Sequence, residues 1–115
     1  MADNHIKQLA NLTDEIMACR ICTRLVDWRE KIGKEKRASY KDWDYWAKPV
    51  PSFGDPNAPL VLLGLAPAAH GGNRTGRVFT GDPSASFLTA AMYEAGLANQ
   101  ATSEHREDGL VLSGV

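Results

Sequence analysis

Residues 60–83 read LVLLGLAPAAHGGNRTGRVFTGDP and carry the clearest structural pattern in the chain. The apolar run 60–65 lies between two prolines, Pro59 and Pro67, which predicts a strand buried on both faces, as in a parallel sheet. Residues 68–81 follow with four glycines and no clear period. Long loops of this kind carry ligand sites at the carboxyl ends of strands. Strand and loop together predict an α/β fold.

Two flanking segments have the period of amphipathic helices. Residues 5–17 repeat apolar side chains at spacings of three and four. Residues 83–95 show a second apolar face, with Asp82 as the predicted N-cap, Pro83 at the first helical position and Gly96 at the end. Strand, long loop and helix form the organising unit of the chain.

The remaining segments are less regular. Residues 23–59 are charged, then aromatic, then rich in prolines, and we expect an extended, partly covered loop. Residues 109–115 resemble the beginning of another strand. Because one strand and its helix cannot make a doubly wound sheet, the chain resembles the first half of a larger domain.

Length and composition limit the function classes. The chain has 115 residues, enough for one domain, and its 43% hydrophobic and 23% charged residues are typical of a globular protein. The longest apolar stretch, 60–69, is too short and too interrupted to cross a membrane. The N-terminus has no secretory signal pattern, so we expect a cytosolic protein without a membrane partner.

Charge is unevenly distributed along the chain. The net charge is −1, but residues 24–80 hold ten basic against six acidic residues, and residues 81–115 hold one against five. On composition alone the basic stretch is best interpreted as a solvated surface. A face that contacts phosphate is the alternative.

The cysteines form a single pair. Cys19 and Cys22 are two residues apart, which in a reducing compartment indicates metal ligation or redox chemistry rather than a structural disulfide. One alternative is a small zinc module in which both join His5 or the ligands of a partner.

The glycine-rich loop does not match the common nucleotide signatures. Its spacing approaches that of a phosphate-binding Walker loop, but Arg77 replaces the required lysine and Val78 replaces the serine or threonine that would hold magnesium. No GxGxxG follows the predicted strand. A nucleotide cofactor is therefore not supported.

Residues 64–82, GLAPAAHGGNRTGRVFTGD, resemble the first active-site motif of the type-5 uracil-DNA glycosylases. The CRIC sequence at 19–22 resembles the cluster-ligand pair of that family, and residues 45–56 resemble its lead-in to the first strand. The resemblance implies a three-layer α/β/α sandwich, of which this chain is an N-terminal portion. It also implies a [4Fe-4S] cluster and hydrolysis of the N-glycosidic bond of uracil, or another deaminated base, flipped out of DNA by a monomer.

The resemblance also implies roles for particular residues. Phe79 corresponds to the phenylalanine that stacks on uracil, although a core position is the commoner fate of a phenylalanine. Leu65 stands where better-known glycosylases have an acid or amide, so Asp82 becomes the candidate for water activation, with an N-cap as its equally weighted alternative. Asn73 is the other catalytic candidate. The predicted substrate contacts are Gly64, Leu65, Ala66, Pro67, His70 and Phe79, and the predicted phosphate contacts are Arg74 and Arg77.

Two features of the family have no counterpart here. The second motif, a His-Pro-Ser segment, is absent, and so are the third and fourth cluster cysteines. Two thiolates cannot hold a [4Fe-4S] cluster, which takes four ligands. A DNA-binding fragment without catalytic activity is therefore a further alternative.

Overall fold

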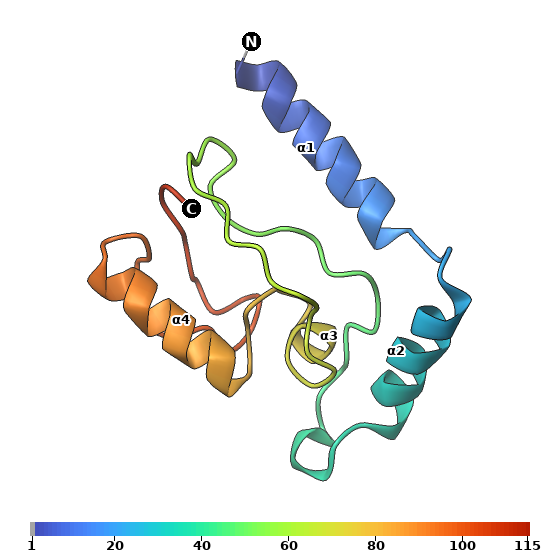
Figure 1. Cartoon of the computed structure of the whole chain (residues 1–115). Coiled ribbons are helices and arrows are strands. Elements are labelled where there is room, and N and C mark those ends of the chain that lie inside the picture. Colours follow the sequence, from blue (N-terminus) through green and yellow to red (C-terminus); the bar gives the residue numbers. More distant parts are fainter. Residues whose placement is uncertain (1) are drawn as a thin grey trace.

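The computed structural model describes residues 2–115, and its regular structure is helical (Figure 1). The elements are α1 (Ala2–Met17), α2 (Thr23–Glu35), the 3₁₀ helix η1 (Ala38–Tyr40), α3 (Gly72–Thr75) and α4 (Pro83–Glu94). The longer helices α1, α2 and α4 lie around a central irregular region that holds the short helix α3. Among residues 2–115 no strand forms, and one isolated antiparallel bridge joins Ala98 to Leu112.

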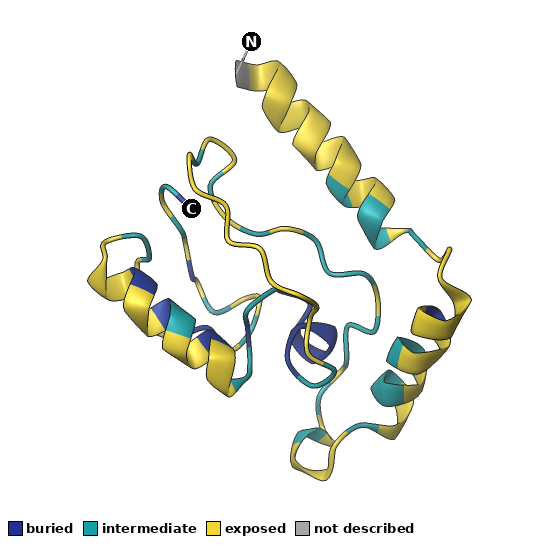
Figure 2. Cartoon of the chain, in the orientation of Figure 1, coloured by how far each residue is buried: buried dark blue, intermediate teal, exposed yellow. Residues whose placement is uncertain are grey.

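The predicted N-terminal helix is confirmed, and it starts slightly earlier than the periodicity indicated. Its apolar stripe includes Ile6, Leu9 and Leu12, all of which remain exposed. Figure 2 shows almost the whole of α1 as exposed, in contrast to α3. The amphipathic face of α1 therefore has little to pack against within residues 2–115.

The prediction of a loop across residues 23–59 was wrong at its start, where α2 forms. Its composition is dominated by good helix formers such as Arg, Lys, Glu and Leu, and these outweigh a weak apolar period. Val26 is buried, and Arg29 joins two neighbours: its Nη2 donates to Cys19 O and its carbonyl accepts from Asn73 Nδ2. Apart from η1, residues 36–59 are irregular, as predicted.

The predicted strand at 60–65 does not form. The segment has no backbone hydrogen bond to another part of residues 2–115. Exposure alternates, since Leu62 is 40% exposed whereas Leu63 is 94% exposed. A strand requires a neighbouring strand to receive its hydrogen bonds, and none lies beside this segment. The α/β/α sandwich is accordingly not seen within the described residues.

The predicted second helix is confirmed together with its cap. Asp82 has extended backbone geometry, and its Oδ1 accepts a hydrogen bond of 2.8 Å from Ala85 N. The inner face of α4 buries Ala85, Thr89 and Met92. Gly96 follows the helix with a left-handed φ of 79°, which favours glycine.

The C-terminal tail pairs locally. Asn99 N donates to Val111 O and Ser113 N donates to Leu97 O, so residues 109–115 fold back on the turn after α4. The tail also reaches the loop at 54–55, where Asp55 N donates to Val115 O. No helix among residues 2–115 is both long and apolar enough to span a membrane.

Candidate active site

The most deeply buried part of the chain is the glycine-rich loop, not a sheet. All seven residues from 71 to 77 are buried, and they include α3 (Figure 2). Close approach requires glycine here: a Cβ on Gly72 would lie 2.8 Å from Pro67 Cβ, and one on Gly71 would collide with Asp82 Oδ2. The loop is therefore folded back on its own two ends.

Phe79 and Gly64, two of the predicted substrate contacts, lie against each other. A Cβ on Gly64 would lie 2.9 Å from Cζ of the Phe79 ring, so no larger residue fits without a shift. Phe79 has a φ of 46°, a left-handed conformation that non-glycine residues rarely adopt. Its carbonyl accepts a 3.0 Å hydrogen bond from Ser103 Oγ, which helps to hold this geometry. Strained residues of this kind cluster at functional sites.

An open hollow of about 980 Å³ lies on one side of the loop. We call it the apolar hollow; it is bounded by α1, residues 60–68 and α4. Its charged side chains are those of Asp55 and Asp82, and the rest of its lining is mostly apolar. Of the predicted site residues, the structure brings Gly64, Leu65, Ala66, Pro67, Phe79 and Asp82 to this hollow.

One carboxylate oxygen of Asp82 caps α4, and the other accepts no hydrogen bond within residues 2–115. Oδ1 caps α4, whereas Oδ2 faces Gly71 at the rim of the apolar hollow and the side chain is half-buried. The N-cap interpretation is thus confirmed. It leaves one carboxylate oxygen available for another contact.

His70 and Asn73 do not line the apolar hollow. His70 Nδ1 lies 2.8 Å from the hydroxyl of Tyr45, and the two rings meet edge to face. Asn73 is buried, and its amide nitrogen donates to Arg29 O on α2. Both residues connect the loop to segments that precede it in the sequence.

The structure corrects the interpretation of Arg74 as a surface group facing phosphate. Its side chain is only 3% exposed. Nη2 donates to Gly81 O at 2.7 Å, and Nε donates to His70 O. The guanidinium carbon lies 3.8 Å from the ring centroid of Tyr40 and 4.1 Å from that of Trp43. Cation–π contacts and hydrogen bonds thus hold Arg74 inside the chain.

Arg77 requires the same correction. It is 4% exposed and forms a bidentate ion pair with Asp108, at 2.9 Å from Nη1 and 3.0 Å from Nη2. Nε donates to Thr80 Oγ1, and Nη2 also donates to Ser103 Oγ. A buried charge needs such partners, and these occupy the guanidinium that was expected to meet DNA phosphate.

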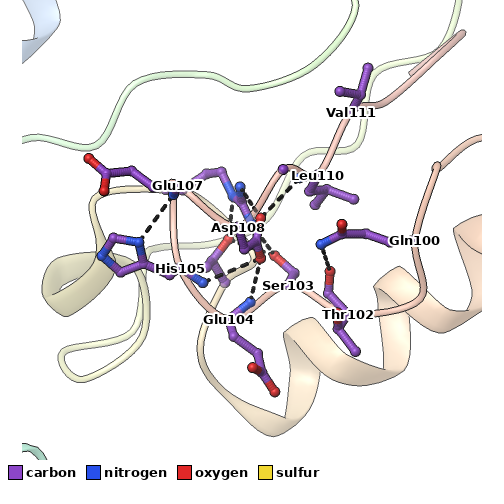
Figure 3. A network of polar contacts seen from close by, with 12 residues as sticks. Gln100, Thr102, Ser103, Glu104, His105, Glu107, Asp108, Leu110 and Val111 are labelled. Carbon is purple, nitrogen blue, oxygen red and sulfur yellow. Dashed lines mark hydrogen bonds and ion pairs between the residues drawn. The ribbon is translucent and has the colours of Figure 1, made fainter.

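Asp108 and Ser103 were missed by the sequence analysis. Figure 3 shows the Asp108 carboxylate where hydrogen bonds converge, including those from Glu104 N and Leu110 N. Burial raises the pKa of Asp108, but the hydrogen bonds from Arg77 and from these backbone groups outweigh it and hold the pKa well below its usual value. Once Arg77 is known to be buried, an acidic partner must exist. No local sequence pattern shows that this partner is Asp108, 31 residues away.

The cysteines lie at the junction of α1 and α2. Both are free thiols; Cys19 is half-buried and Cys22 precedes α2 as its N-cap residue. Residues 2–115 contain no group of three or more metal-ligating side chains. A zinc site that joins His5 to the two cysteines is therefore not formed, and this part of the chain does not complete a four-ligand cluster site.

Comparison with known proteins identifies the family. The sequence model of the uracil DNA glycosylase superfamily matches residues 51–114, more than half of the chain and all of the glycine-rich loop. The chain belongs to this superfamily. The type-5 uracil-DNA glycosylase of Thermus thermophilus is 54% identical over 93 residues, which is 81% of this chain and 42% of that protein.

Two further type-5 uracil-DNA glycosylases show a similar match. The Mycobacterium leprae protein is 50% identical over 89% of this chain and 44% of its own length. The Pyrobaculum aerophilum protein is 47% identical over 87% of this chain and 43% of its own length. The chain thus spans less than half the length of these uracil DNA glycosylase relatives.

Replacing Asp108 by Asn should destabilise the chain by about 3–5 kcal/mol at pH 7, because the buried Arg77 loses its counter-ion. The low pKa of Asp108 in the folded state means that its contribution is complete above the unfolded pKa of about 4 and is lost gradually as the pH falls from there through the much lower pKa of the folded state. Urea unfolding between pH 6 and pH 3 should therefore show a shallower loss of stability in Asp108→Asn than in the wild type.

The exposed neighbour Glu107 offers a matched control. Glu107→Gln should leave both the stability at pH 7 and its pH dependence close to those of the wild type. Parallel pH profiles for Asp108→Asn and the wild type would contradict the assigned ion pair.

Proposed function

We propose that this chain is the N-terminal portion of a type-5 uracil-DNA glycosylase with an α/β/α sandwich. The whole domain would hydrolyse the N-glycosidic bond of uracil, or another deaminated base, in DNA. The observation that carries the proposal is the placement of Phe79 beside Gly64, at the hollow that Asp82 also lines. Membership of the uracil DNA glycosylase superfamily supports the same chemistry.

Phe79 supplies the surface for the base. A base that has left the DNA stack needs an aromatic face to replace its lost stacking. The Phe79 ring lines an open hollow, and its edge packs against the backbone of Gly64. Gly64, Leu65, Ala66 and Pro67 would contact the base at the edge of the ring, with Leu65 fully exposed there.

Asp82 supplies the carboxylate. Its Oδ1 is fixed by Ala85 N, so the orientation of the group is set, and Oδ2 can accept a hydrogen bond from the attacking water. Leu65 cannot take a proton. We consider Asn73 and His70 weaker candidates than Asp82 for activating the water. The Asn73 amide already contacts Arg29, and the His70 ring already contacts Tyr45.

Cys19 and Cys22 fit half of a four-cysteine site. They are unpaired thiols at one helix junction, and Cys22 is exposed to any further ligand. We propose that they bind a [4Fe-4S] cluster whose other two ligands come from the rest of the domain. The cluster would tie this junction to that second part.

A completed enzyme is the appropriate material for testing activity. It consists of residues 1–115 joined to the part of the Thermus thermophilus relative that follows the matched stretch. Release of uracil from a DNA duplex by this enzyme tests the proposed function directly. Salt-dependent DNA binding without base release would instead support a non-catalytic fragment.

In the completed enzyme, Phe79→Ala should lower the catalytic efficiency about five- to hundredfold, because stacking on an aromatic ring contributes about 1–3 kcal/mol. Phe87→Ala is the matched control, since Phe87 is 81% exposed and does not line the hollow. Single-turnover kinetics and thermal melting should be measured on both. Full efficiency combined with a lowered melting temperature in Phe79→Ala would make Phe79 a core residue.

Asp82→Asn keeps a good N-cap but removes the ionisable carboxylate. General-base assistance contributes about 100- to 10,000-fold, so the single-turnover rate of the completed enzyme should fall at least about tenfold at an unchanged melting temperature. Asp55→Asn, at the other acidic group of the hollow, should have a much smaller effect on this rate. An unaltered rate in Asp82→Asn would leave Asp82 as a cap alone.

Cys19→Ser should reduce the iron and acid-labile sulfide bound by the completed enzyme, because serine does not replace a thiolate ligand in such a cluster. Ala18→Ser changes the neighbouring exposed residue and serves as the control. Iron and sulfide should be determined after anaerobic purification. Unchanged contents in Cys19→Ser would reject the ligand assignment.

A further inference from the structure

Arg29 on α2 contacts two segments that the proposed function uses, the cysteine pair and the glycine-rich loop. Its Nη2 donates a hydrogen bond of 3.2 Å to Cys19 O, in the segment between α1 and α2. Its carbonyl accepts a hydrogen bond of 3.3 Å from Asn73 Nδ2, on the buried helix α3. One residue therefore joins the cysteine pair to the glycine-rich loop.

The main chain of Arg29 is the fixed end of this connection. Asn73 is buried, its N–H donates to Ala68 O, and its carbonyl accepts from Ala47 N. Because groups in a buried hydrogen-bond network are held rigidly, the Asn73 amide keeps Arg29 O at a defined point. The guanidinium group extends from that point to Cys19.

A second contact holds the cysteine segment to α2. Arg20, the residue after Cys19, forms an ion pair with Glu30, the next residue along α2. Its side chain is 63% exposed, and surface pairs of this kind contribute little to stability. The contact from Arg29 is part-buried and charge-assisted, so it matters more for the position of Cys19.

One nitrogen of the Arg29 side chain is buried and has no acceptor. Nε makes no hydrogen bond within residues 2–115, and solvent does not reach it. Neither of the two ion pairs in this part of the chain includes Arg29, so no carboxylate neutralises its charge by direct contact. A buried donor without an acceptor is costly, and an ion or group that binds beside it is a recognised reason for one. An anion held by the cysteine pair would satisfy both the donor and the charge.

Metal-bound thiolates are anionic acceptors of this kind. Cysteine binds a metal as the thiolate, so a group held by Cys19 and Cys22 brings negative charge to this segment. Metal ligands are oriented by hydrogen bonds from residues that do not touch the metal, and losing such a residue lowers metal affinity about 10- to 100-fold. Arg29 combines the anchor, the contact to Cys19 and the positive charge that this role needs.

We propose that Arg29 is the positioning residue of the cysteine site. Its Nη2 fixes the main chain of Cys19 before any metal binds, and its charge and free Nε–H favour the thiolate pair that holds the [4Fe-4S] cluster. The inference rests on the cluster assignment in the proposed function. It does not depend on the roles of Phe79 and Asp82.

Arg29→Met removes the charge and every N–H donor of the side chain but keeps most of its length. In the completed enzyme, purified anaerobically, this variant should release iron to a ferrous chelator at least about tenfold faster than the wild type. Its reduction equilibrium should also shift at least about threefold toward the oxidised cluster, because a nearby cation and N–H donors stabilise the more negative reduced state. A potentiometric titration followed by absorbance measures this shift.

Two further variants separate these effects from a general loss of structure. Arg29→Lys keeps the charge but not the planar fork, so its reduction equilibrium should stay close to that of the wild type while iron release is faster. Lys31→Met removes an exposed cation two residues further along α2 and should change neither measurement. Melting temperatures show whether each variant folds. If Arg29→Met does not fold, iron release at the wild-type rate from Arg29→Lys would overturn the inference.

The outcomes for this inference and for the proposed function are distinct. Unchanged iron release in a folded Arg29→Met enzyme that carries a cluster would overturn the inference and leave the proposed function in place. Equal shifts of the reduction equilibrium in Lys31→Met and Arg29→Met would also overturn it, since the position of the charge would then not matter. A wild-type completed enzyme that releases uracil but binds no iron would overturn the cluster assignment and this inference together. A cluster that responds to Arg29→Met as described, in an enzyme that releases no uracil, would count against the proposed activity alone.

Discussion

The bidentate ion pair between Arg77 and Asp108 is the interaction on which the arrangement of the site depends. A guanidinium group can be buried only with a counter-ion and hydrogen-bond partners. Here the partners come from the glycine-rich loop and from residues 103–110, so the charge joins two segments that are 31 residues apart. Through Ser103 the same network reaches the carbonyl of Phe79. The backbone of Phe79, which carries the ring, is thereby held by a network centred on a buried ion pair.

Local patterns predicted the two helices with strong signals, α1 and α4, and missed α2, η1 and α3, which lack them. The helix after Asp82 has a cap, a proline at its first position and a regular apolar face, and each is encoded within a few residues. Residues 23–35 carry helix-forming side chains but a weak apolar period, so their helix was predicted as a loop. Arg74 and Arg77 looked like surface cations because their aromatic and acidic partners lie far away in the sequence.

The extended segment 60–65 shows a different limit. Its composition is that of a central strand, and the structure does leave it extended, but hydrogen bonding between strands cannot be encoded by one strand alone. Within the candidate site, the sequence indicated which residues lie together only where they belong to one continuous motif. Glycines, Phe79 and Asp82 lie within one continuous motif, so their proximity follows from local geometry, whereas a sheet depends on segments from several places in a domain.

The left-handed backbone of Phe79 sets backbone strain against the base-stacking role proposed for its ring. Glycine adopts a φ of 46° without the strain that a larger residue carries there, a strain of about 1–3 kcal/mol. Under the proposed function, phenylalanine at this position carries backbone strain in exchange for a contact with the base. Thermostabilising designs of this domain should leave residue 79 unaltered.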